Sequence, residues 1–140
     1  MAVSNRMPVV IATPETAPSV PGRRVFLNYR ELGVTEASQG KMRAQVLKAN
    51  PGTQQRTGWH THLCDMQFLY MTAGWLDLEI EGKGLVRLNV GDSVLLPGGT
   101  VHQEVNYSDD MEVVEVSLPA EMGTEPCAPP AGAREPAGME

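Results

Sequence analysis

Turn residues interrupt the chain at short intervals between residues 22 and 118, so that each stretch between them is only a few residues long. The interruptions are PG at 21–22, NPG at 50–52, EGKG at 81–84, PGG at 97–99 and NYSDD at 106–110. The runs between them are often alternating and rich in β-branched or aromatic residues: RVFLNY, MRAQVLKA, MQFLYM, WLDLEI, LVRLNV, SVLL and EVVEVSL. This pattern predicts an antiparallel β-sandwich or barrel. Residues 28–40 lack clear alternation and are expected to form a loop or a helical turn.

The two ends of the chain differ in composition from its centre. Four prolines fall within residues 1–21 and five within residues 119–140. At 140 residues the chain is about one domain long, since a domain has roughly 100–200 residues. We therefore expect an N-terminal arm over 1–21, one barrel domain over 22–118 and a disordered C-terminal tail over 119–140. Alternatively, the N-terminal arm crosses to a partner subunit with its apolar residues, which include Met7, Val9 and Ile11.

Charge and composition argue against several classes of partner. The formal net charge is −6 without a block of like charges, whereas nucleic-acid-binding proteins cluster lysine and arginine on one face. No apolar run approaches the ~18 residues that span a bilayer, and VVIA at residues 9–12 is too short for the apolar region of a signal peptide. Cys64 and Cys127 do not form a disulfide framework, which fits a reducing compartment. We expect a cytoplasmic protein that binds neither nucleic acid nor membranes.

Two of the three histidines lie one residue apart, in the stretch WHTHLCDMQFLYM. Side chains at positions i and i+2 share a face of a strand but lie about 200° apart around a helix. His60 and His62 can therefore readily share one metal ion only if residues 58–63 are extended, and the spacing predicts a strand there. If residues 65–71 form the next strand, Gln67 can face the histidines across a short loop. Its expected neighbours on the same face are Asp65, Leu69 and Met71.

The third histidine, His102, follows 40 residues after His62 in the stretch GDSVLLPGGTVHQEVN. Gly91 opens a turn, Pro97 to Gly99 force another, and His102 then begins a further strand. A metal site requires the fold to bring this histidine to the other two.

Together, the two stretches resemble the paired motifs of the cupin superfamily. The first is HxH, four residues, an acid or amide, six residues and glycine; the second is glycine, five residues, PxG, two residues, histidine, three residues and asparagine. The matching residues are His60, His62, Gln67 and Gly74, then Gly91, Pro97, Gly99, His102 and Asn106. The chain departs from the pattern twice, because Gln67 stands where glutamate is commonest and Gln54 stands where a glycine usually precedes the first histidine.

The resemblance implies an all-β, antiparallel jelly-roll (cupin) barrel, usually dimeric, so a homodimer is expected. It also implies one divalent metal ion near the barrel interior, held by His60, His62, Gln67 and His102. Imidazole suits several metals, so zinc, iron, manganese and nickel all stay open. An amide oxygen is a poorer ligand than a carboxylate, and Gln67 could instead hold a metal-bound water. Asp65 could supply an anionic ligand, and Cys64 a soft one, although alternation turns Cys64 away from Gln67.

A neutral fourth ligand affects the expected chemistry. Three imidazoles and an amide leave the full +2 charge on the metal, which favours Lewis-acid over redox chemistry. We therefore expect isomerisation, cyclisation, ring opening or elimination on a small oxygenated substrate such as a keto or hydroxy acid. The resemblance implies parallels, since small cupins with three histidines and a glutamine include the ring-opening enzyme of pectin-derived unsaturated uronates, and other cupins are polyketide cyclases. Two alternatives stay open: an Fe(II)-dependent dioxygenase, as in iron cupins, and a non-catalytic small-molecule binder or sensor.

Lewis-acid chemistry on a carbon acid usually needs a general base near the metal. Glu115, in the last run EVVEVSL, is the first candidate, and it faces either the cavity or water. Glu104 is the second, because it shares a strand face with His102. Arg43 and Gln45 share a face of MRAQVLKA, where they could bind a substrate carboxylate or lie exposed.

Overall fold

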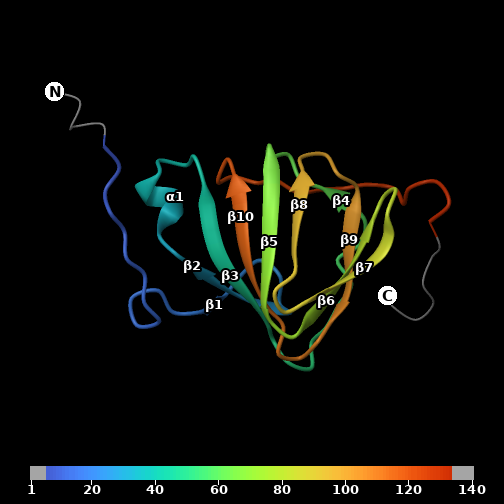
Figure 1. The fold of residues 1–140 in the computed structure, drawn as a ribbon, viewed down its shortest axis with the longest axis horizontal. Helices are drawn as coiled ribbons and strands as arrows, with labels where there is room; N and C mark the ends of the chain where they lie inside the picture. The colour runs from blue at the N-terminus through green and yellow to red at the C-terminus, as the bar shows by residue number, and fades with distance from the viewer. Residues whose placement is uncertain (1–5, 134–140) are drawn as a thin grey trace.

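The computed structural model describes residues 6–133, which form two antiparallel sheets and one short helix, α1 (Val34–Ala37). The first sheet has the strand order β1-β2-β3-β10-β5-β8, with bounds Val20–Pro21, Leu27–Glu31, Arg43–Ala49, Glu112–Leu118, Met66–Ala73 and Ser93–Pro97. The second has the order β11-β4-β9-β6-β7, with bounds Glu125–Pro126, His60–Thr61, His102–Tyr107, Trp75–Ile80 and Gly84–Asn89. The sheets face each other (Figure 1), which confirms the expected jelly-roll fold. In the described part of the chain, no helix is long and apolar enough to span a bilayer.

The alternating runs of the sequence correspond closely to strands. Six of them become β3, β5, β6, β7, β8 and β10. The first run, RVFLNY, is strand only in its second half, where β2 begins at Leu27. Residues 28–40 form a helical turn only in part, because β2 continues to Glu31 and α1 is four residues long.

Side chains on the inner faces of the two sheets form the core. In β5 every second residue is buried, as the alternation predicted: Gln67, Leu69 and Met71. In β10 the inner face carries Val113, Glu115 and Ser117, all buried. Each of these strands therefore buries polar side chains beside apolar ones, and buried polar groups require hydrogen-bond partners or a ligand.

The outer face of the six-stranded sheet is apolar around β5. Met66, Phe68 and Tyr70 are exposed there, and Leu95 of β8 and Leu118 of β10 lie on the neighbouring strands and are also exposed. A contiguous exposed apolar patch is typical of a protein–protein interface. The homodimer expected from the resemblance stays a prediction.

Two short strands lie outside the predicted domain limits of 22 and 118. Strand β1 pairs with β2, and β11 pairs with β4. Residues 119–127, which we call the C-terminal strap, differ from the disordered tail expected there. The N–H of Leu63 donates to Met122 O (2.8 Å), and the N–H of Cys127 in the strap donates to Trp59 O (3.0 Å). Residues 1–5 and 134–140, which belong to the predicted arm and tail, lie outside the described residues.

The turn between β8 and β9 packs directly against the segment that follows β4. The N–H of Gly98 donates to Asp65 O (2.8 Å), and that of Gly99 donates to His62 O (3.0 Å). A Cβ on Gly98 would lie 1.8 Å from the Cys64 carbonyl oxygen, so only glycine fits this approach. This packing holds the start of β9, and with it His102, next to the histidine pair.

Candidate metal centre

The three histidines of the sequence converge inside the barrel, as their spacing and the cupin resemblance led us to expect. His60 on β4 lies opposite His102 on β9 in the register of the sheet, with ring centroids 4.4 Å apart. The His62 ring centroid lies 4.9 Å from that of His60 and 5.1 Å from that of His102. One ligand atom from each ring lies within 4.8 Å of the other two, and all three residues are buried.

Each histidine is oriented by a hydrogen bond from its Nδ1 to a main-chain carbonyl oxygen. The acceptors are Gly58 for His60 (2.7 Å), Gly123 for His62 (2.9 Å) and Thr100 for His102 (2.9 Å). A carbonyl only accepts, so Nδ1 carries the proton in each ring and Nε2 keeps its lone pair. This is the arrangement that metal-binding histidines usually have.

Gln67 is held by a buried carboxylate. Its Nε2 donates to Glu115 Oε2 (2.6 Å), while Gln45 Nε2 donates to Glu115 Oε1 (2.6 Å) from the other side. Gln45 lies directly opposite Glu115 in the β3–β10 register. Because a carboxylate only accepts, the NH₂ group of Gln67 must face Glu115. Its Oε1 is therefore directed away from Glu115.

Two buried polar atoms of this site lack a hydrogen-bond partner among the described residues: Gln67 Oε1 and His102 Nε2. Buried polar atoms without a partner are uncommon in folded proteins and indicate a missing water or ion. Imidazole nitrogens and an amide oxygen are ligands for zinc, iron, manganese and nickel. The residues present therefore fit a divalent metal ion, which stays a prediction.

Glu104 adds a negative charge beside the histidines. Its carboxylate oxygens lie 3.9 Å from His60 Nε2 and 3.7 Å from His102 Nε2. Burial alone would raise the pKa of the Glu104 carboxyl, but attraction to His60, His102 and Arg24 outweighs this effect and lowers it. The sequence argument counted three imidazoles and an amide as the metal ligands and expected Glu104 on the strand face of His102, and the fold places its carboxylate beside two of these imidazoles.

Burial favours the neutral form of His60 and His62. It lowers the pKa of His62 from 6.5 to about 4, although the hydrogen bond to Gly123 acts in the opposite direction. Burial likewise lowers the pKa of His60, against the opposing effect of Glu104. Neutral imidazole is the form that binds metals.

The remaining sequence candidates lie elsewhere or have other contacts. Asp65 is exposed and Cys64 is buried, and neither belongs to the group of converging ligand atoms in residues 6–133. Glu115 faces the barrel interior, and both of its oxygens are occupied by amides. Gln45 binds Glu115, while Arg43 lines the cavity described next.

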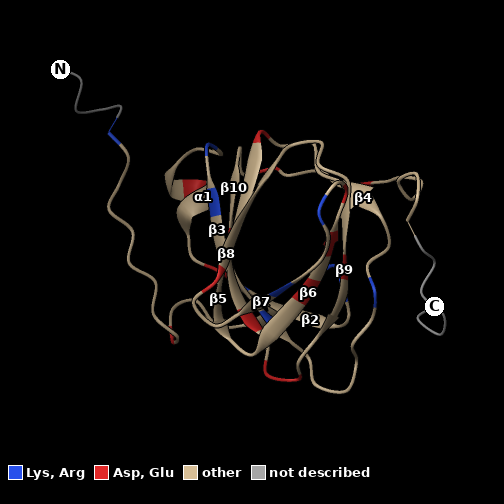
Figure 2. Cartoon of the chain, turned by 45° about the vertical axis from the view of Figure 1, so that its right-hand side comes forward, with Lys and Arg blue, Asp and Glu red and all other residues tan. Residues whose placement is uncertain are grey.

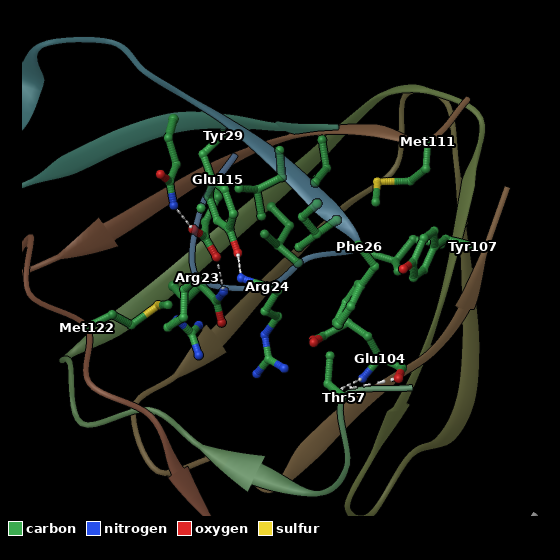
Figure 3. A pocket seen from close by; sticks show the side chains of 18 of the residues that line it. Arg23, Arg24, Phe26, Tyr29, Thr57, Glu104, Tyr107, Met111, Glu115 and Met122 are labelled. Atoms are coloured by element: carbon green, nitrogen blue, oxygen red, sulfur yellow. Dashed lines mark hydrogen bonds between the residues drawn. The ribbon is translucent and has the colours of Figure 1, made fainter. Parts of the chain in front are cut away.

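A cavity of about 410 Å³ opens beside the histidines. Its wall includes His60, His62, Gln67, Glu104 and Glu115. Sequence reasoning missed three of its other lining residues: Arg23, Arg24 and Met122. The two arginines precede β2 and Met122 belongs to the C-terminal strap, so neither strand periodicity nor motif spacing marks them. Figure 3 shows Arg23 and Arg24 extending into the cavity.

A family profile described as "Cupin domain" matches residues 46–117, half of the chain. The chain belongs to the cupin family. The match includes all three histidines and Gln67, whereas the arginines at the cavity and the C-terminal strap lie outside it. No match was found among curated proteins.

Solved structures support the cupin fold at low sequence identity. KdgF from a Halomonas species is 20% identical, with a TM-score of 0.65, over 78% of this chain and 94% of that one. The polyketide cyclase RemF from Streptomyces resistomycificus is 14% identical, with a TM-score of 0.71, over 89% of both chains. A cupin from Silicibacter pomeroyi described as a sugar phosphate isomerase is 19% identical, with a TM-score of 0.61, over 76% of this chain and 74% of that one.

Replacing Glu115 tests the orientation of Gln67. In Glu115→Gln the new amide has one acceptor oxygen, so it cannot accept from Gln45 and Gln67 as the carboxylate does. We expect zinc affinity, measured by competition with a chelator, to fall about 10–100-fold. Glu81→Gln, in the exposed turn after β6, removes the same charge and should leave the affinity unchanged. Equal affinities in all three proteins would contradict the positioning role.

A second variant tests the C-terminal strap. Gly123 has φ 64°, and a Cβ there would lie 3.1 Å from Leu63 Cβ. Gly123→Ala should displace the carbonyl that orients His62 and weaken zinc binding about 10–100-fold. Gly132→Ala is the control, since Gly132 has φ 85° and no atom within 4 Å of an added Cβ. Similar zinc affinities of the two variants would exclude a role for the strap.

The pKa of His62 predicts how the stability of the metal-free cupin depends on pH. Between the ordinary value of 6.5 and the folded value of about 4, the unfolded chain binds a proton at this residue that the folded chain does not. The free energy of unfolding should therefore decrease as the pH falls through this range. Urea unfolding of chelator-treated protein measures it, and His62→Gln should show a weaker pH dependence. If the free energy of unfolding of His62→Gln depends on pH as strongly as that of the unchanged protein, the effect does not come from His62.

Proposed function

We propose that this cupin is a metal-dependent enzyme that uses Lewis-acid chemistry on a small oxygenated substrate, as an isomerase, cyclase, ring-opening enzyme or lyase. The proposal depends mainly on one observation. Three histidine rings converge with their Nδ1 atoms hydrogen-bonded to carbonyl oxygens, and Gln67, whose Oε1 has no partner among the described residues, lines the cavity beside them. His60, His62, His102 and Gln67 would hold the metal, which when bound polarises a carbonyl or hydroxyl oxygen of the substrate.

Glu104 is the group we propose as the proton acceptor. Its carboxylate lies beside two of the histidines and is partly accessible, with 23% of the side chain exposed. It lines the cavity, so a substrate C–H or O–H adjacent to the polarised oxygen can approach it. Glu115 is less suited to this role, because each of its oxygens already accepts a hydrogen bond of 2.6 Å.

The apolar part of the cavity wall would hold the carbon skeleton of the substrate. Leu69 and Val113 project from β5 and β10, and Leu76 and Met111 lie close by in the same lining. These side chains limit water around the reacting atoms, which strengthens electrostatic interactions there.

Two of the similar structures support non-redox chemistry. RemF is described as a polyketide cyclase, and the Silicibacter pomeroyi protein as a sugar phosphate isomerase. At this low sequence identity the similarity establishes only the fold, so the substrate of this cupin is to be identified by assay.

The test combines metal analysis with turnover. Protein purified without a metal-binding tag should contain about one divalent metal ion per chain by elemental analysis, and His62→Ala should lose most of it. Gln67→Glu should keep the metal, because glutamate is also a ligand, but change its metal preference or activity. On a panel of keto and uronic acids we expect equal turnover with and without oxygen, and at least about a 100-fold loss in Glu104→Gln.

Three other outcomes would overturn the proposal. Full metal occupancy in His62→Ala would exclude the histidine site. Oxygen uptake in step with turnover would identify a dioxygenase instead. A protein that binds metal and acids but turns none of them over would be a binding or sensor cupin.

A further inference from the structure

Three arginines line the cavity of a chain whose net charge is −6. Arg23 and Arg24 lie in the loop between β1 and β2, and Figure 3 shows their side chains extending into the cavity. Arg43 begins β3, and its Nε is buried without a hydrogen-bond partner among the described residues. The cavity thus collects cationic groups from a loop and a strand, although the chain as a whole has 17 acidic and 11 basic residues. Figure 2 marks acidic positions red and basic positions blue.

No carboxylate forms a close ion pair with these arginines within residues 6–133, although Glu104 and Arg24 attract each other at longer range. The ion pairs found there join Arg87 to Asp77, and Glu104 to two of the histidines. Glu115 lines the same cavity, but its two oxygens accept from Gln45 and Gln67. No side-chain hydrogen bond or ion pair of the three arginines is found in this part of the chain, so their guanidinium groups are available to a ligand.

The loop that carries Arg23 and Arg24 is held in place by the barrel. The N–H of Arg24 donates to Tyr29 Oη (3.3 Å), and Asn50 Nδ2 donates to Val25 O (3.3 Å). A Cβ on Gly22 would lie 2.2 Å from the Tyr29 ring, so the loop packs directly on that side chain. The Arg24 Cζ lies 5.7 Å from the centre of the Phe26 ring, and Phe26 is buried in the core. This support reduces the entropy lost when the arginines bind a ligand.

We propose that Arg23, Arg24 and Arg43 form an anion-binding subsite that holds a carboxylate or phosphate group of the substrate. The inference rests on the proposed function, because it assumes that an oxygenated carbon of the same molecule lies at the metal centre. The guanidinium group suits it, since it binds planar carboxylates and phosphates through two parallel hydrogen bonds. All three residues lie outside the matched cupin region of 46–117, so the preference for an anion comes from the part of the chain that precedes it.

Binding of matched sugar pairs by calorimetry tests the subsite. The probes are galacturonate against galactose, and glucose 6-phosphate against glucose, each with zinc-loaded and with chelator-stripped protein. We expect at least one anionic probe to bind at least about tenfold more tightly than its neutral partner, with or without zinc. The pair that shows the preference identifies the anion as carboxylate or phosphate.

The variants assign that preference to the arginines. Arg23→Gln combined with Arg24→Gln should reduce it by about tenfold or more, and Arg43→Gln should reduce it separately. Lys41→Gln combined with Lys83→Gln removes the same charge from exposed positions that do not line the cavity, and should leave it unchanged. Thermal unfolding of each variant checks that it is folded.

The outcomes separate the subsite from the proposed function. Equal affinity for anionic and neutral probes, or no binding of either anionic probe, would overturn the subsite. If the preference is lost when zinc is removed and is retained in the arginine variants, the anion binds at the metal. That result would overturn the subsite but leave the proposed function. A preference that depends on the arginines in a protein that binds no metal would support the subsite and exclude the proposed function.

Discussion

A buried carboxylate between two amides is the interaction on which the candidate metal centre depends. Glu115 lies at the inner face of β10, where an unpartnered charge would cost several kcal/mol. Gln45 and Gln67 supply one donor to each of its oxygens. The same bonds determine which end of the Gln67 amide faces away from Glu115. A residue that looked like a candidate base in the sequence is thus accounted for as the group that orients a candidate ligand.

Main-chain carbonyls perform the equivalent task for the histidines, and they come from separate segments. Gly58 precedes β4, Thr100 belongs to the turn before β9, and Gly123 lies in the C-terminal strap. The strap carries the acceptor for His62 and, through Met122, part of the cavity wall. The cupin motifs therefore contain the candidate ligands, whereas one of the groups that orient them lies beyond the matched region.

Acidic and basic side chains both line the cavity. Glu104 lies beside the histidines, while three arginines project from the loop before β2 and from β3. Arginines and a histidine cluster in one cavity suit the substrate that we propose, with an anionic group at one end and an oxygenated carbon at the other. It also changes the sequence argument about Gln67, because Glu104 brings a negative charge to a site that the motif alone describes as neutral. The proposal of Lewis-acid chemistry therefore relies on a carboxylate positioned beside the candidate metal ligands as much as on the neutral amide.

The sequence by itself determined most of the strands, which residues share a strand face and which histidines can share a metal. These properties follow from local periodicity: a period of two puts Gln67 on one face with Leu69 and Met71, and HxH puts two histidines on one side. The same periodicity left open whether Glu115 faces the cavity or water. Only the tertiary structure decided which inward groups meet. Gln67 and Glu115 are 48 residues apart, and they touch because β5 and β10 are neighbours in the sheet. The strand order, the path of the C-terminal strap and the position of the loop that carries Arg23 and Arg24 depend on long-range packing. No local pattern in the chain encodes that packing.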